Sequence, residues 1–201
     1  MAIELTITNL FQFVSTLLPF LLIFFMVMIS IFNQDLKGMV YLAGILITSV
    51  INVVLLNVIG NESDVASNST CNIFDLPFNM NRYNVPSLNS VLIAFTMAYL
   101  FLPMITSNQT NYVIIAALLS IFIIDGISKI TNRCTTVAGV LLGLLTGLIF
   151  GFLWYILFHS TGLDSLLYFD EVISNKTYCS RPKQQTFKCS VYKNGELLAS
   201  Y

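Results

Sequence analysis

The stretch VAGVLLGLLTGLIFGFLWYILF, residues 137–158, decides the fold class of this chain. It has 22 residues and no charge, and about 20 helical residues are enough to cross the roughly 30 Å hydrocarbon core of a bilayer. Four earlier runs have the same character: residues 11–32, 39–59, 86–104 and 111–130. All five are continuously apolar, whereas the strands of a transmembrane barrel alternate apolar and polar positions. We therefore expect an all-α, multispanning transmembrane bundle of about five helices.

The composition of the whole chain agrees with membrane insertion. Of the 201 residues, 56% are hydrophobic and only 9% are charged, which excludes an ordinary soluble domain. The formal net charge of -1 provides no basic field, so the expected surroundings are a lipid bilayer and not nucleic acid. The first run lacks a basic segment before it and a small-residue cleavage pattern after it, so we expect it to stay in the mature protein.

The residues outside the runs form loops and one longer tail. We divide the chain into a transmembrane bundle, residues 1–158, and a polar tail outside the membrane, residues 159–201, in which residues 191–195 could form a small hairpin. Six Lys and Arg residues lie on the side of the tail and three on the other side, which favours a cytoplasmic tail. The tail is the expected contact for other membrane or capsid proteins.

The loops and the tail also carry candidate sites of covalent modification. Asn61 and Asn68 begin glycosylation sequons in the second loop, and chance matches in a chain rich in Asn and Ser are the alternative. The four cysteines divide by side of the membrane, which selects one pair in the loops and one in the tail. These expected disulfides join Cys71 to Cys134 and Cys179 to Cys189, with free thiols as the alternative.

Three short motifs follow one another in the second half of the chain. Pro86 and Ser87 begin one apolar run, Ser128-Lys129 follows 42 residues after Pro86, and AGVLLGLLTG, residues 138–147, begins the last run. This arrangement resembles the membrane lipid phosphatases of the phosphatidic acid phosphatase type 2 superfamily over residues 75–158. In that family a PSGH motif begins one helix, and an SR…H…D motif precedes a helix that begins with an AGxxxG-like sequence. The resemblance implies a helical membrane fold with a site for a lipid phosphate.

The departures from the family pattern concern its catalytic groups. Asn89 stands where the PSGH motif has its histidine, and an amide cannot donate a proton to a leaving oxygen. The stretch ITNRCTTVA, residues 130–138, also lacks the second histidine, which would activate the nucleophile. The single histidine of the chain, His159, follows the last run and should lie across the membrane from Ser87 and Ser128. The sequence therefore predicts a catalytically inactive relative, and the alternative is a lipid phosphate phosphatase with an unorthodox site.

Several polar residues should remain together at one membrane face. They could bind a lipid head group through hydrogen bonds and charge. The alternative is that the two in the third run cap that helix while the basic ones sit at the membrane interface. These candidates for a remnant head-group site are Ser87, Asn89, Ser128, Lys129 and Arg133.

Glycines recur every four residues along the last run, so one face of that helix lacks side chains and another backbone can approach it. They are Gly139, Gly143, Gly147 and Gly151. The partner is either the third or fourth helix of the same chain or a second copy of the chain.

Among the polar residues inside the other apolar runs, three more are candidates for a specific role. Asp125 is a functional candidate because an intramembrane carboxylate is costly, and an ion pair with Lys129, four residues on, is the alternative. Asn52 and Asn57 are expected to form hydrogen bonds between helices.

No metal or cofactor is expected. One histidine and scattered cysteines do not match the spacing of zinc ligands, and nucleotide-binding and nucleophile-elbow motifs are missing from the sequence. The function that we expect is non-catalytic: a structural or scaffolding protein, with the internal membrane of a large DNA virus particle as a possible location.

Overall fold

The computed structural model describes residues 7–59, 85–106, 108, 110–168, 190–193 and 196–200. Five long helices account for most of them, which confirms the all-α prediction. Their bounds are α1 Ile7–Asn33, α2 Lys37–Ile59, α3 Leu88–Thr106, α4 Tyr112–Thr131 and α5 Val137–Ser160. Each is long and apolar enough to cross a membrane. The protein is a multispanning helical membrane protein.

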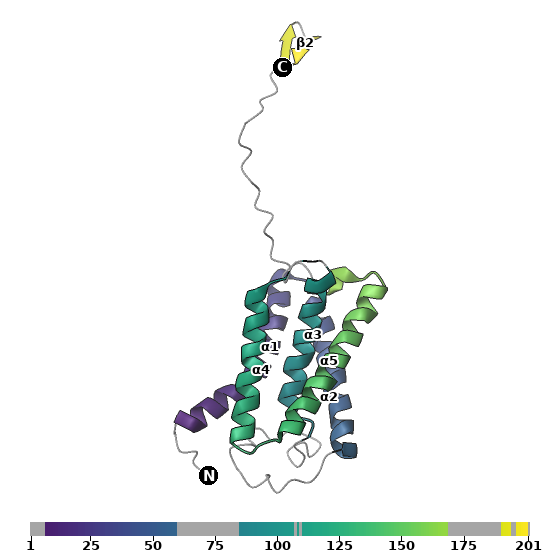
Figure 1. Cartoon of the computed structure of the whole chain (residues 1–201). Helices are drawn as coiled ribbons and strands as arrows, with labels where there is room; N and C mark the ends of the chain where they lie inside the picture. Colours follow the sequence, from purple (N-terminus) through teal and green to yellow (C-terminus); the bar gives the residue numbers. More distant parts are fainter. Residues whose placement is uncertain are drawn as a thin grey trace.

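Helix α3 lies at the centre of the bundle (Figure 1) and contacts each of the other four helices. Around it, α1, α2, α5 and α4 follow one another in a ring, since each also packs on its neighbours in that order. Every residue of α3 from Asn89 to Leu100 is buried. A helix enclosed on all sides in this way positions the polar residues at its beginning inside the protein.

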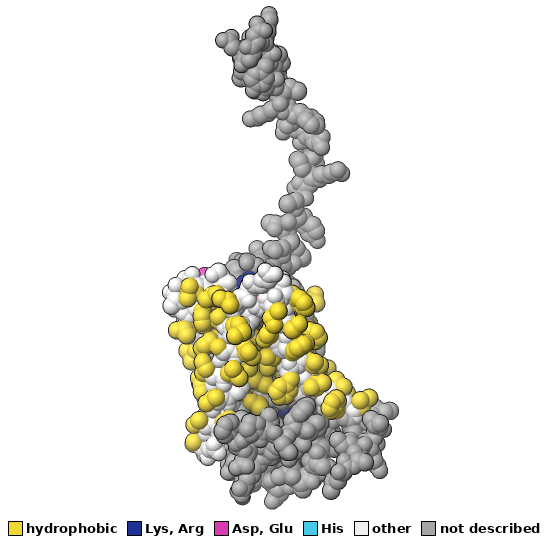
Figure 2. Space-filling model, turned by 180° about the vertical axis from the view of Figure 1, so that it is seen from behind, with side chains coloured by type: hydrophobic (Ala, Val, Ile, Leu, Met, Phe, Trp, Pro, Cys, Tyr) yellow, Lys and Arg dark blue, Asp and Glu magenta, His cyan; other side chains and the backbone are white. Residues whose placement is uncertain are grey.

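The outer surface of the ring is apolar. Figure 2 shows hydrophobic side chains over one side of the bundle, with few charged side chains, which lie near its ends. Phe25, Val50, Val113 and Ile149 are among the large side chains that are more than half exposed. In water such a surface would be an aggregation liability, whereas in a bilayer it faces lipid tails.

Two helices begin at residues that satisfy their first backbone donors. The side chain of Asn111 accepts hydrogen bonds from the N–H groups of Val113 and Ile114 at the start of α4. The hydroxyl of Thr136 accepts one from the N–H of Gly139 at the start of α5, at 3.1 Å. Asn111 is the first residue of its apolar run and Thr136 directly precedes the next one, so both caps lie where the chain enters the hydrocarbon.

Helix α1 is bent. Figure 1 shows its first turns, in purple, at an angle to the other helices. Pro19 lies inside the helix and has no N–H to bond to the carbonyl oxygen of Ser15, four residues earlier, so it weakens the helix at this point. The first half of α1 therefore runs in a different direction from the second half, and α1 packs against α4.

The glycines of α5 bring its backbone against α3. Gly143, Gly147 and Gly151 are buried, and a Cβ atom added at Gly143 would lie 2.8 Å from the carbonyl oxygen of Ser87. One added at Gly151 would lie 2.7 Å from that of Phe95. Real Cβ atoms essentially never approach so closely, so side chains at these positions would push the helices apart. The contact is made within the chain, against the third helix.

The fourth glycine, Gly139, accepts a hydrogen bond that links the start of α5 to the start of α3. The backbone N–H of Ser87 donates a hydrogen bond to the carbonyl oxygen of Gly139, at 3.0 Å. Ser87 directly precedes α3, and Gly139 lies in the first turn of α5. The two helices therefore start side by side and run parallel.

The packed bundle continues past the predicted boundary at residue 158. After α5, the short 3-10 helix η2, Asp164–Leu166, leads into Leu167 and Tyr168, which are buried. The Tyr168 hydroxyl donates a hydrogen bond to the carbonyl oxygen of Met26, and its ring meets that of Tyr41 edge-on at 6.2 Å. Apolar and aromatic contacts at the end of the bundle therefore hold the first part of the predicted tail.

A hairpin forms near the end of the chain. Strands β1, Ser190–Lys193, and β2, Glu196–Ser200, pair antiparallel, with Lys193 opposite Glu196 and a bulge between Val191 and Tyr192. The hairpin predicted at residues 191–195 overlaps this one at residues 191–193, and the observed strands reach further, to Ser190 and Ser200.

Candidate functional site

A fully buried carboxylate lies where three helices meet. Asp125 of α4 has no exposed surface. Its Oδ1 atom accepts a hydrogen bond from Nδ2 of Asn89 on α3, at 3.0 Å, and one from the hydroxyl of Ser15 on α1, at 3.4 Å. The Asn89 amide also donates to the carbonyl oxygen of Thr16, at 3.4 Å. These bonds tie the bent first half of α1 to the central helix and to α4.

Further polar residues that are buried or partly buried lie on α1, on α4 and in the segment that follows α4. Gln12 of α1 is buried one turn before Ser15, and its side-chain amide donates to the sulfur of Cys134, at 3.3 Å. Ser128 of α4 is buried one turn after Asp125 and lies on the same face of the helix. We call this group the polar cluster: Gln12, Ser15, Asn89, Asp125, Ser128 and Cys134.

The predicted ion pair between Asp125 and Lys129 does not form. In the part of the chain that the structure describes, no ion pair links Asp125 to Lys129. Asp125 points inward to α1 and α3, where amide and hydroxyl donors are available, whereas Lys129 is only partly buried.

The five residues of the predicted head-group site do not line one open site. Ser87, Asn89 and Ser128 are buried, Lys129 is partly buried and Arg133 is exposed. Ser87 contacts α5 through its backbone, while Asn89 faces α1 and α4. The expectation that Asn89 caps α3 is wrong, because its side chain is used between helices.

The two asparagines of α2 behave differently from each other. Asn57 is exposed, and its amide donates to the carbonyl oxygen of Val53 in the same helix at 3.0 Å, so the prediction of an interhelical bond is wrong there. Asn52 is fully buried, and neither its amide nitrogen nor its oxygen has a hydrogen-bond partner among the described residues.

His159 lies far from the polar cluster. It is near the end of α5, where its Nδ1 atom is 2.7 Å from Oδ1 of Asp164. Twenty residues separate it from Gly139, which touches Ser87 at the other end of the helix, so the distance along the axis is about 30 Å. The imidazole cannot act on a group bound near Ser87.

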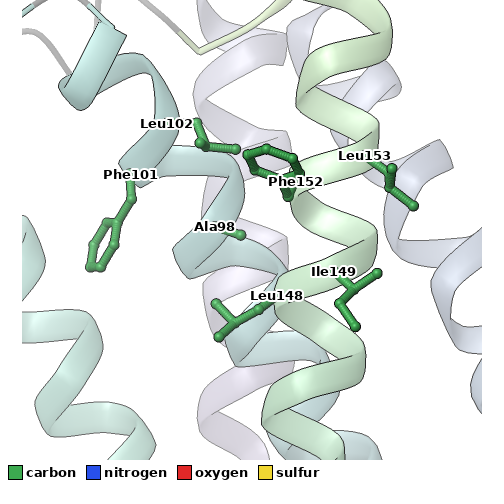
Figure 3. A pocket seen from close by; sticks show the side chains of 7 residues that line it. All are labelled: Ala98, Phe101, Leu102, Leu148, Ile149, Phe152 and Leu153. Atoms are coloured by element: carbon green, nitrogen blue, oxygen red, sulfur yellow. The ribbon is translucent and has the colours of Figure 1, made fainter.

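One cavity in the described part of the bundle is apolar (Figure 3). It has a volume of about 410 Å³ and lies between α3 and α5, in the half of the bundle near the end of α5. Its lining residues are Ala98, Phe101, Leu102, Leu148, Ile149, Phe152 and Leu153. With no polar side chain in its wall, this cavity is suited to an apolar occupant and not to a reaction on a phosphate.

The predicted modification sites lie mostly outside the described residues. Asn61, Asn68, Cys71, Cys179 and Cys189 all belong to this group. Cys134 is disulfide-bonded, and its pairing with Cys71 stays a prediction because the partner lies outside the described residues.

The sequence analysis missed the contribution of α1. Gln12, Ser15 and Thr16 were not singled out, although they are polar residues in an apolar run and are spaced three and four residues apart. That spacing places them on one helix face, and it is the signal that could have identified α1 as a partner of the intramembrane aspartate.

No family model, curated protein or solved structure matches the chain. The described residues also contain no group of three or more His, Cys, Asp or Glu side chains that could hold a metal ion. The polar cluster offers hydrogen-bond donors, hydroxyl oxygens and one carboxylate. Such a set can join helices or bind a small polar group.

Proposed function

We propose that this protein is a non-catalytic integral membrane protein with a structural or scaffolding role, whose bundle is related to that of the lipid phosphatases. The observation that carries the proposal is the use made of Asn89. The residue at the position of the family's motif histidine is 4% exposed and bonded to the Asp125 carboxylate and to the backbone of α1. It connects helices and has no free access to a substrate.

The electrostatics of the polar cluster also support a non-catalytic role. Phosphoryl transfer requires an activated nucleophile and positive groups around the phosphate. Asp125 instead places a buried carboxyl group beside Asn89. An anionic carboxylate at that point would repel a phosphate.

The architecture suits a structural role in a bilayer. The tight contact of α3 with α5 and the bonds that join α1 and α3 to α4 connect four of the five helices. The tail then serves as the contact for other membrane or capsid proteins. We place the protein in the internal membrane of a large DNA virus particle, with which its Asn- and Ile-rich composition is compatible.

The alternative function is a lipid phosphate phosphatase with an unorthodox site. It is favoured by the position of Ser128, Lys129 and Arg133, a hydroxyl and two cations in one short stretch at the membrane face near Ser87. Such groups can hold a phosphate even where the motif histidines are replaced.

Phosphate release distinguishes the two functions. The purified protein in detergent is incubated with phosphatidic acid and, separately, with an isoprenyl phosphate, alongside the Ser87→Ala and Lys129→Ala variants. We expect no turnover by any of the three proteins. Turnover that is lost in either variant would establish the enzyme and refute the structural role.

Fractionation tests the location. If the protein is a virion component, it should copurify with the particles. It should also be protected from added protease until detergent opens the internal membrane. Recovery in cellular membrane fractions alone, with none in purified particles, would refute the viral setting.

A further inference from the structure

Two buried oxygen atoms of α4 have no hydrogen-bond partner among the described residues. They are Oδ2 of Asp125 and the hydroxyl oxygen of Ser128, whose residues are 0% and 3% exposed. The two residues are three positions apart, which places them on one face of the helix. Leaving such atoms unsatisfied in a membrane interior is costly, so each one requires a partner that the described side chains do not supply, a water molecule or an ion.

A third oxygen comes from the bend in α1. Pro19 cannot supply the N–H that would bond to the carbonyl oxygen of Ser15 within the helix. The hydroxyl of the same Ser15 is 3.4 Å from Oδ1 of Asp125. The residue whose carbonyl lacks its helical donor thus contacts the carboxylate through its hydroxyl. Carbonyl oxygens freed from helical bonding are ligands of alkali cations in other membrane proteins.

We propose that the polar cluster binds a small monovalent cation of the Na⁺ type, held by Asp125, Ser128 and the backbone of Ser15. The ligands are all oxygen atoms, which suit a hard cation. The single carboxylate matches the charge of one monovalent cation. A divalent ion would leave an excess charge inside the bundle.

Two other charges lie near this site. Lys129 follows Asp125 by one turn and is partly buried, and its positive charge opposes cation binding without forming an ion pair. Arg133 is exposed and further along the chain. Removal of the Lys129 charge should therefore strengthen cation binding. The proposal does not depend on whether the protein is structural or catalytic.

Thermal unfolding of the full chain in detergent tests the site. Choline chloride is replaced stepwise by NaCl at constant ionic strength. Na⁺ should raise the melting temperature of the natural protein by a few degrees and then saturate, because it binds only the folded state. Asp125→Asn should abolish the shift, Ser128→Ala should raise the Na⁺ concentration at half-effect several-fold, and Lys129→Gln should lower it.

Ser120→Ala is the matched control. Ser120 is on the same helix, is exposed, and donates its hydroxyl to the carbonyl oxygen of Ala116, so this variant should keep the full Na⁺ response. If Asp125→Asn does not fold, the comparison of Ser128→Ala with Ser120→Ala decides. Equal melting temperatures in NaCl and choline chloride would overturn the proposal, as would a Na⁺ response that Ser128→Ala leaves unchanged.

Discussion

The side-chain amide of Asn89 donates a hydrogen bond to the carboxylate of Asp125 across 3.0 Å, and both residues are buried. Asn89 is the second residue of the central helix, and Asp125 lies six residues before the end of α4. The bond thus joins the two helices near one membrane face. With the Ser15 hydroxyl, it supplies two donors to one oxygen of an intramembrane acid that has no ion pair with Lys129.

The packing of α5 on α3 predicts that even small additions on the glycine face destabilise the protein. Gly147→Ala would place a Cβ atom 2.7 Å from that of Ala94 and closer still to backbone. We expect the variant to lower the free energy of unfolding by about 1–3 kcal/mol, as overpacking does. Gly143→Leu and Gly147→Leu should cost more than this, and more than Leu144→Phe, as measured by thermal unfolding in detergent.

Gly126→Ala is the control for these variants. A Cβ atom at Gly126 would be 3.5 Å from the Val140 side chain, an ordinary contact. Because alanine is the better helix former, this change should be neutral or slightly stabilising. If Gly147→Ala and Gly126→Ala melt at the same temperature, the close approach of α5 to α3 is not a source of stability.

Five spans place the ends of α4 and α5 on opposite sides of the membrane. Thr131 and Ser160 are exposed at the last residues of these helices. Single cysteines at the two positions, in a background with the native cysteines replaced by serine, should differ in labelling by an impermeant reagent on sealed vesicles. Equal labelling of both positions before the vesicles are opened would contradict the five-helix topology.

Tyr168 fastens the first part of the tail to the bundle. Its ring is buried against Tyr41, and its hydroxyl bonds to the carbonyl of Met26. Tyr168→Phe removes only the hydrogen bond and should cost about 1 kcal/mol, whereas Tyr168→Ala also leaves a cavity and should cost about 3–5 kcal/mol.

Limited proteolysis provides a second measurement at this position. Cleavage within residues 161–168 should be faster in Tyr168→Ala than in Tyr168→Phe, because the chain there loses its anchor. Identical cleavage in the two variants would show that the ring does not hold the segment.

The five helices could be predicted because a bilayer imposes length and composition on each span separately. The predicted run at residues 111–130 and helix α4, Tyr112–Thr131, differ by one residue at each end. Helix α1 begins four residues before its apolar run, and α5 ends two residues after its run. Apolar content does not indicate where a helix ends outside the hydrocarbon.

The arrangement of the helices was harder to predict. The enclosed position of α3 depends on contacts with four other helices, and an apolar residue is equally compatible with lipid and with a protein core. The partners of Asp125 illustrate the same difficulty. Sequence spacing favoured Lys129, four residues away, whereas the bonds go to Asn89 and Ser15, which are 36 and 110 positions away.

A double-mutant cycle on Asn89 and Asp125 tests most directly the central claim that Asn89 serves the structure of the bundle. The free energy of unfolding in detergent is measured for the natural protein, Asn89→Ala, Asp125→Ala and the double variant, all in choline chloride. We expect a coupling energy of about 1 kcal/mol, in the range of interhelical hydrogen bonds in membranes. Additive effects, within about 0.3 kcal/mol, would show that the two side chains do not stabilise each other and would contradict the account.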